Sequence, residues 1–336
     1  MKNKNSQFMK LAIQEAWKYQ LLTYPNPAVG ATVVKSNNLL SVEAHKEAGL
    51  PHAEVNALKS AFLKEFPTSK LKDMISSEDI HNYLIKYHNG FFNDCEIYVT
   101  LEPCNHIGKT PACAMLLESI DIKKVYIGTL DPNDNASGGK ERLENSNIEV
   151  EVGICKNETD ELLFPFRKWQ SSSFRFFKLA MREDGSVTGG YITTKDSLTL
   201  VHNIRTKLDL MVIGGQTVRV DKPTLDARFA KINKAPDILI YSKNNNIDNN
   251  IPLFKVKNRK VIISDDLKYI NDNNFIMIEG GYNLLDTIKS YCDFIVLFIS
   301  HKETFENKFD LNILNYKKVY SYYINQYDEI IFLRKL

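Results

Sequence analysis

The 336-residue chain contains no apolar run near the roughly 18 residues that a membrane-spanning helix requires. It has only five cysteines, an odd number at irregular spacing, which argues against a disulfide framework. Its net charge of +2 lacks the basic excess typical of nucleic-acid binding. The polar start, residues 1–6, precedes no apolar core of a signal peptide. These absences predict a cytoplasmic protein with neither a membrane nor a nucleic-acid partner.

The composition, 43% hydrophobic and 25% charged, is ordinary for a globular protein, and the length suggests about two domains. Strands and helices alternate in the first half, which favours an α/β sandwich around one sheet. A second such series follows. The expected strands are 28–35, 39–45, 96–101, 124–129, 149–153, 174–180, 209–213, 238–241, 260–263, 275–278, 294–299 and two in 317–336, and the main helices are 6–22, 53–62, 112–117, 139–144, 157–169, 196–207 and 284–290.

The predicted domains are therefore 1–155 and 171–336, joined by a linker helix at 156–170. Residues 64–94 interrupt the alternation of the first domain. Their mixed charge and four aromatic residues indicate a helical insertion packed on that domain.

Three side chains of the first half are candidate metal ligands: His52, Cys104 and Cys113. One imidazole and two thiolates suit Zn²⁺, and three protein ligands leave the fourth position for water. Bound Zn²⁺ lowers the pKa of such a water to about 7. Glu54 is placed to take the water's proton and pass it to a leaving group. His-x-Glu alone is common, but followed by Pro-Cys and a second cysteine it is typical of zinc deaminases.

Other motifs surround these residues: Pro-Asn-Pro-Ala-Val-Gly at 25–30, Thr-Leu-Glu-Pro-Cys at 100–104 and Gly-Lys-Thr-Pro at 108–111. With them, residues 6–155 closely resemble the deaminase domain of the bifunctional riboflavin-biosynthesis family. The eight residues between Cys104 and Cys113 differ from the two-residue gap of cytidine and tRNA-adenosine deaminases. The resemblance implies a cytidine-deaminase-like α/β/α sandwich. It also implies that Asn26 hydrogen-bonds the pyrimidine ring and that His45 and Lys109 meet the ribose phosphate.

Residues 174–300 resemble the reductase domain of the same family, which has a dihydrofolate-reductase-like α/β fold. The match rests on Lys-Leu-Ala at 178–180, Gly-Gly-Gln-Thr-Val-Arg-Val-Asp at 214–221 and Ile-Glu-Gly-Gly at 278–281. Glycines at a strand-to-helix turn allow backbone N–H groups to approach a phosphate. The resemblance places Lys178, Leu225, Arg228 and Glu279 at the substrate, and Thr217, Asp221, Ser242, Gly280, Gly281, Tyr282, Asn283 and Leu284 at NADPH.

The resemblance implies an enzyme that deaminates 2,5-diamino-6-ribosylamino-4(3H)-pyrimidinone 5′-phosphate and then reduces its ribosyl group to a ribityl chain with NADPH. It would be both a hydrolase and an oxidoreductase, and a homo-oligomer. One departure concerns the reductase: Leu198 and Thr199 stand where the family has an arginine for the substrate phosphate, although Lys195 or Arg205 could replace it.

Three alternatives stay open. The chain could be a monofunctional deaminase whose degenerate reductase domain serves oligomerisation, and NADPH binding would separate these readings. A nucleic-acid deaminase is disfavoured by the cysteine spacing and the near-neutral charge. A non-catalytic zinc scaffold is disfavoured by Glu54, since a structural site would have a fourth protein ligand and no need of a base.

Overall fold

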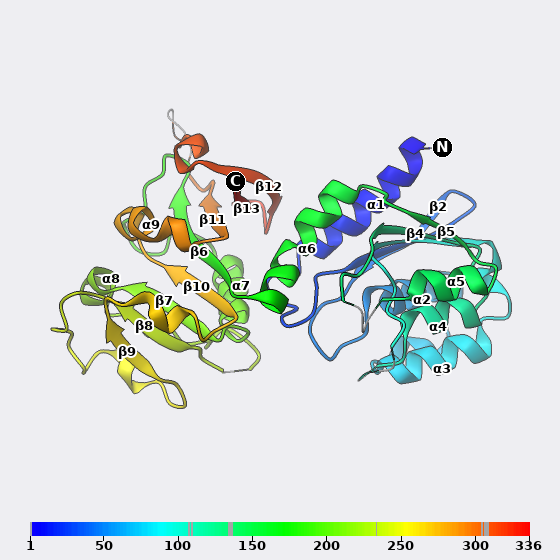
Figure 1. Ribbon diagram of the computed structural model, residues 1–336, viewed down its shortest axis with the longest axis horizontal. Helices are drawn as coiled ribbons and strands as arrows, with labels where there is room; N and C mark the ends of the chain where they lie inside the picture. Colours follow the sequence, from blue (N-terminus) through cyan, green and yellow to red (C-terminus); the bar gives the residue numbers. More distant parts are fainter. Residues whose placement is uncertain are drawn as a thin grey trace. The chain divides into compact units, whose positions relative to one another are not determined.

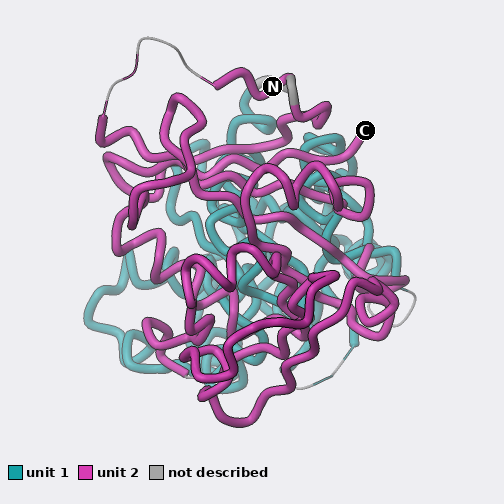
Figure 2. The backbone as a smooth tube through the Cα atoms, turned by 90° about the vertical axis from the view of Figure 1, so that its left-hand side faces the viewer, with its two compact units in different colours: residues 1–167 teal, residues 168–336 magenta. Residues whose placement is uncertain are grey.

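The computed structural model describes residues 2–106, 108, 110–133, 137–232, 234–303, 305 and 309–336. The chain forms two compact units, 1–167 and 168–336 (Figure 2). The division falls inside helix α6 (Lys156–Ser171), and each unit has its own sheet (Figure 1). Within the described residues, we find no helix with the length and apolar character needed to cross a membrane.

The sheet of the first unit has five strands in the order β2-β1-β3-β4-β5. The central strand β3 pairs antiparallel with β1 and parallel with β4, which is parallel to β5. The predicted strands are all present, with bounds β1 (Gly30–Lys35), β2 (Asn38–Ala44), β3 (Cys95–Leu101), β4 (Lys124–Thr129) and β5 (Glu149–Val152).

Helices cover both faces of this sheet, as the sandwich prediction requires (Figure 1). One face packs against α2 (Ala53–Glu65), α4 (Cys113–Ser119) and α5 (Gly139–Asn145) in a single apolar core. The other face carries α1 (Lys2–Trp17), whose apolar side is buried, with α6 beside it. The first helix ends five residues earlier than expected because residues 18–20 continue in tighter i→i+3 turns.

The insertion at 64–94 folds into helix α3 (Ser77–Tyr87) between two 3-10 helices, Lys70–Asp73 and Phe91–Asp94. Ser76 caps α3 by accepting from the Asp79 N–H. The apolar side chains Leu71, Ile80, Leu84 and Phe92 of the insertion are buried in the same core as α2, α4 and α5. The insertion is therefore part of the core of the first unit.

The sheet of the second unit has eight strands in the order β12-β13-β11-β6-β10-β7-β8-β9. The six strands from β11 to β9 are parallel, and β13 and β12 add antiparallel pairs at one edge. Their bounds are β6 (Phe174–Arg182), β7 (Leu210–Gly214), β8 (Asp237–Tyr241), β9 (Val261–Ser264), β10 (Phe275–Glu279), β11 (Phe294–Ser300), β12 (Tyr316–Tyr323) and β13 (Asp328–Lys335).

Three helices connect these strands: α7 (Lys195–Arg205), α8 (Gly215–Asp221) and α9 (Tyr282–Ile288). The sequence interpretation treated residues 214–221 as a motif and did not predict α8. Since β10, β7 and β8 are parallel neighbours, the residues that follow them meet at one edge of the sheet. Ligands of open α/β sheets bind at this carboxyl edge.

Candidate active sites

The three predicted metal ligands converge in the first unit. Their donor atoms lie within 4.8 Å of one another. His52 Nδ1 is 3.6 Å from the Cys104 sulfur and 3.3 Å from the Cys113 sulfur. Zinc bonds of about 2.1 Å to nitrogen and 2.3 Å to sulfur fit donors at this spacing. The donor set therefore suits a tetrahedral zinc with one position left for a ligand.

The fold places these ligands at the ends of buried elements. His52 is the N-cap residue of α2, and Cys113 is the first residue of α4. Cys104 lies just beyond the buried strand β3. The Cys113 N–H points to the Cys104 sulfur at 3.4 Å, and the Ala114 N–H donates to the Cys104 carbonyl. These bonds hold the two cysteine segments together.

The ligand atoms are electrostatically suited to a cation. A hydrogen bond from the Cys113 thiol, together with His52, lowers the pKa of Cys104 to about 4. Burial alone would lower the pKa of His52, but the nearby Cys104 sulfur raises it overall. The same contact and burial raise the pKa of Cys113, so of the two thiols Cys104 more readily becomes the thiolate that binds metal.

Glu54 lies in the first turn of α2, two residues after His52, and is only 4% exposed. Burial raises the pKa of Glu54 to about 7, although the positive charge of His52 opposes this shift. A buried carboxyl group beside three metal ligands has the position of a proton carrier.

The structure brings Asn26 and His45 together next to this cluster. His45 Nε2 lies 3.1 Å from Asn26 Nδ2, and His45 Nδ1 lies 3.1 Å from the Pro51 carbonyl oxygen. Because the carbonyl can only accept, Nδ1 carries the proton and Nε2 accepts from Asn26. Burial lowers the pKa of His45 to about 4, so its ring is neutral. Lys109, the third residue predicted to bind substrate, lies outside the described residues.

Glu102 is a supporting residue that the sequence interpretation did not single out. Its carboxylate is 5% exposed and accepts three backbone N–H groups, from Asp131, Gly138 and Lys140. A Cβ on Gly139 would stand 1.9 Å from the Pro103 carbonyl oxygen, so only glycine allows this approach. The available signal was the position of Glu102 directly before Pro-Cys.

We expect Glu102→Gln to lower the free energy of unfolding by about 1–3 kcal/mol, because hydrogen bonds to a charged group contribute that much. The bound zinc content should also fall, since the Cys104 segment loses its anchor. Denaturant unfolding and metal analysis would measure both. Glu141→Gln, an exposed change on helix α5 next to Lys140, is the matched control and should alter neither. If Glu102→Gln and Glu141→Gln had the same free energy of unfolding and the same zinc content, Glu102 would not support the Cys104 segment.

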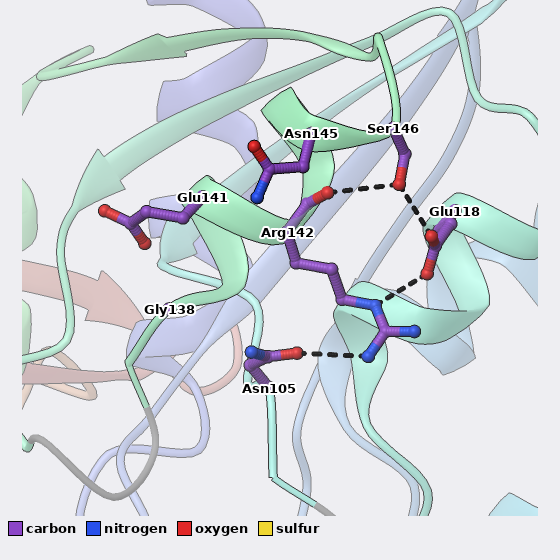
Figure 3. A pocket seen from close by; sticks show the side chains of 7 residues that line it. All are labelled: Asn105, Glu118, Gly138, Glu141, Arg142, Asn145 and Ser146. Carbon is purple, nitrogen blue, oxygen red and sulfur yellow. Dashed lines mark hydrogen bonds and ion pairs between the residues drawn. The ribbon is translucent and has the colours of Figure 1, made fainter.

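A surface hollow of about 700 Å³ lies beside the Cys104 segment (Figure 3). Arg142 donates to Glu118 at 2.6 Å and to Asn105 at 3.4 Å, and Ser146 donates to Glu118. These bonds tie Asn105, the residue after Cys104, to α4 and α5. The hollow is lined by Asn105, Glu118, Gly138, Glu141, Arg142, Asn145 and Ser146.

The second unit holds a partly buried ionic cluster at Glu279, the last residue of β10. Glu279 pairs in register with Lys178 of β6, and Lys178 Nζ lies 2.9 Å from one carboxylate oxygen. Arg205, at the end of α7, donates to the other oxygen at 3.0 Å. Burial alone would raise the pKa of Glu279, but these two cations lower it to about 2. Lys178 and Glu279, both predicted to contact the substrate, thus form an ion pair with each other.

The predicted cofactor residues lie after β7, β8 and β10, at the carboxyl edge of the sheet. A Cβ on Gly280 would stand 2.7 Å from Leu284, and one on Gly215 would stand 2.5 Å from Ser242. Gly281 has no heavy atom within 4 Å of its Cβ position, so its backbone is accessible. Thr217 and Asp221 lie on α8, Asn283 is exposed on α9, and Tyr282 donates to the Gly185 carbonyl.

The candidates for the missing phosphate arginine are not equivalent. Leu198 and Thr199 lie on α7. Arg205 donates to Glu279 and to the Asp226 carbonyl, so two of its N–H groups already have partners. Lys195, the first residue of α7, is exposed. Lys195 is therefore the better placed replacement.

Comparison with known proteins agrees with this division into two sites. The family model for the cytidine and deoxycytidylate deaminase zinc-binding region matches residues 2–129. Riboflavin biosynthesis protein RibD of Aquifex aeolicus is 33% identical over 88% of this chain and 86% of that protein. RibD of Bacillus amyloliquefaciens is 31% identical over 68% of this chain but only 57% of its own length.

Solved structures extend the likeness to the whole chain. A diaminohydroxyphosphoribosylaminopyrimidine deaminase/5-amino-6-(5-phosphoribosylamino)uracil reductase from Thermotoga maritima has a TM-score of 0.64 and 25% identity, covering 100% of this chain and 99% of that one. Acinetobacter baumannii RibD, at 24% identity and a TM-score of 0.64 over the full length of both chains, has the same fold. The chain therefore belongs to the RibD family of bifunctional riboflavin biosynthesis enzymes.

Proposed function

We propose that the first unit catalyses the zinc-dependent hydrolytic deamination of 2,5-diamino-6-ribosylamino-4(3H)-pyrimidinone 5′-phosphate. The observation that carries this proposal is the convergence of His52, Cys104 and Cys113 beside the buried carboxyl group of Glu54. Zinc held by these three residues would supply a water that is activated for attack at neutral pH. The reaction replaces the 2-amino group by oxygen and releases ammonia.

The side chains of the first unit would then divide the work. Glu54 would take one proton from the attacking water and pass it to the ring nitrogen, and would then pass the remaining hydroxyl proton to the amino group, which leaves as ammonia. Asn26 would hydrogen-bond the pyrimidine ring, and His45 would hold the Asn26 amide in place through Nε2. Because its ring is neutral and both nitrogens are engaged, His45 would orient the site more than it would attract the phosphate.

We further propose that the second unit reduces the ribosyl group of the deaminated product with NADPH. The cofactor would supply the hydride, and the chain would supply binding and orientation. Thr217, Ser242 and the turn at 280–284 would hold NADPH at the carboxyl edge. Glu279 would fix Lys178, whose remaining N–H groups would bind substrate oxygens.

A zinc assay tests the ligand set directly. We expect Cys113→Ser to reduce bound zinc from about one atom per chain to a small fraction, because a hydroxyl is a poor replacement for a thiolate ligand. Cys95→Ser and Cys155→Ser are the controls, since both residues lie in the same unit outside the cluster. Loss of zinc in either control, or full zinc in Cys113→Ser, would overturn the ligand assignment.

One coupled assay separates the bifunctional enzyme from the monofunctional alternative. The alternative is favoured by Leu198 and Thr199, which stand where the family has an arginine. The purified protein receives the diaminopyrimidine substrate, and ammonia release and NADPH oxidation are measured separately. We expect both. Ammonia release without NADPH oxidation or NADPH binding would leave the second unit as an oligomerisation module.

A further inference from the structure

The segment 222–229, which follows α8, carries Leu225 and Arg228, two residues that the family resemblance places at the substrate. We infer that Arg259 and Arg205 are positioning residues of the reductase: together they hold this segment in the shape that presents Leu225 and Arg228 to the substrate. The inference rests on the proposed reductase function. It assigns a role to Arg259, which lies far along the chain, just before β9.

Arg259 binds three backbone carbonyls at once. Its guanidinium donates to Leu225 at 2.6 Å, to Thr224 at 2.8 Å and to Leu253 at 2.6 Å. Burial lowers the pKa of Arg259 to about 10, a sign that the charge is kept from water. Carbonyl oxygens are the groups that compensate such a charge. An arginine with five N–H donors in a rigid fork can span them, which lysine cannot.

Arg205 binds the next carbonyl of the same segment. It donates to the Asp226 carbonyl at 3.2 Å while its other terminal nitrogen bonds Glu279. Three successive carbonyls, at 224, 225 and 226, are thus held by two arginines. The Phe229 N–H donates to His202 Nδ1 at 3.3 Å and fixes the far end. Burial and the Arg205 charge lower the pKa of His202 to about 4, so its ring is neutral and can accept.

The backbone of this segment needs such restraint. Leu225 has a φ of +54° and Lys222 a φ of +43°, in the left-handed region that bulky residues disfavour. Such conformations persist where the surrounding contacts enforce them, and they gather at binding sites. Leu225 is also 6% exposed, so its side chain has a fixed place.

The arginines also link the two halves of the substrate site. The carboxylate of Asp226 accepts from Arg228 Nε at 2.8 Å, while its carbonyl is held by Arg205. Arg205 in turn bonds Glu279, the partner of Lys178. Arg228 is about half-exposed and can meet a phosphate from solvent. Its position relative to Lys178 therefore depends on these bonds.

The test uses Arg259→Met and Arg259→Lys in the full-length protein, with Lys257→Met as control, because Lys257 is an exposed cation two residues away. We expect Arg259→Met to raise KM for the deaminated substrate at least tenfold, since it removes three charged hydrogen bonds. The kcat and the affinity for NADPH should change less than threefold. Arg259→Lys should recover part of the KM, and Lys257→Met should match wild type. The affinity for NADPH, which would bind to the same unit as the substitution, reports on whether that unit is intact in each variant.

Hydrogen exchange of the peptide that contains the Phe229 amide gives a second readout, independent of reductase activity. In Arg259→Met its exchange should accelerate at least tenfold. The inference would be overturned if Arg259→Met changed neither the KM nor the exchange rate. It would also be overturned if kcat and NADPH affinity fell by the same factor as the KM rises. If wild type does not oxidise NADPH, the proposed function fails, and the exchange result alone decides whether Arg259 holds the segment. Should Arg259→Met fail to fold, Arg259→Lys decides by the same two readouts.

Discussion

Glu54→Gln should abolish most ammonia release while the protein keeps its fold and its zinc. Glutamine has nearly the same size, so the α2 helix and the ligand cluster should remain, but an amide cannot accept the proton of the attacking water. General acid–base groups contribute about 10²–10⁴-fold to rate, and the loss should lie in that range. The kcat for ammonia release and the zinc content per chain are the two measurements.

The matched control for this variant is Glu65→Gln, an exposed change at the other end of α2. It should leave ammonia release within twofold of wild type, as expected for an exposed site. NADPH oxidation with deaminated substrate should be normal in both variants, because the reductase site lies in the other unit. Near-normal ammonia release by Glu54→Gln with full zinc would mean that another group carries the proton.

Glu279→Gln should impair the second unit in two ways. It leaves Lys178 and Arg205 without their carboxylate. Because the Glu279 side chain is 21% exposed, the cost should lie below the about 3–5 kcal/mol of a fully buried pair. The substitution also frees Lys178 to move, so NADPH oxidation should fall strongly. Asp286→Asn, an exposed ion-pair residue on α9, is the control and should cost less than about 1 kcal/mol.

The same residue predicts a pH dependence with a definite sign. The pKa of Glu279 is about 2 in the folded protein, below its ordinary value of 4.5. The carboxylate therefore stabilises the fold above about pH 4.5, and that contribution is lost as the pH falls toward 2. The difference in unfolding free energy between wild type and Glu279→Gln should shrink by about 2 kcal/mol or more between pH 6 and pH 2.5. A pH-independent difference would show that Glu279 gains nothing from its charged state.

The cluster of candidate metal ligands was predictable because few residue types bind zinc. His52, Cys104 and Cys113 could be recognised from type, order and spacing, and Glu54 from its place two residues after the histidine. The strands were equally visible, since runs of buried apolar residues such as 294–299 have few other uses in a folded chain. The motifs around Lys178 and Glu279 placed both at one site, and the parallel pairing of β6 and β10 put them in register.

The supporting contacts were decided only by the tertiary structure. Glu102 holds backbone N–H groups up to 38 residues away, and Arg259 holds carbonyls 34 and 35 residues away. Every residue offers a backbone carbonyl and nearly every residue an N–H, so such partners leave no pattern of residue types to read. The bonds of Arg205 to Glu279 and to the Asp226 carbonyl were likewise not visible in the sequence. The sequence by itself determined which chemistry the chain carries, because that chemistry demands particular side chains. The tertiary structure alone decided how those side chains are positioned. The supporting side chains bind backbone groups, which all residues have, so only the position of a backbone group in the fold makes it a partner.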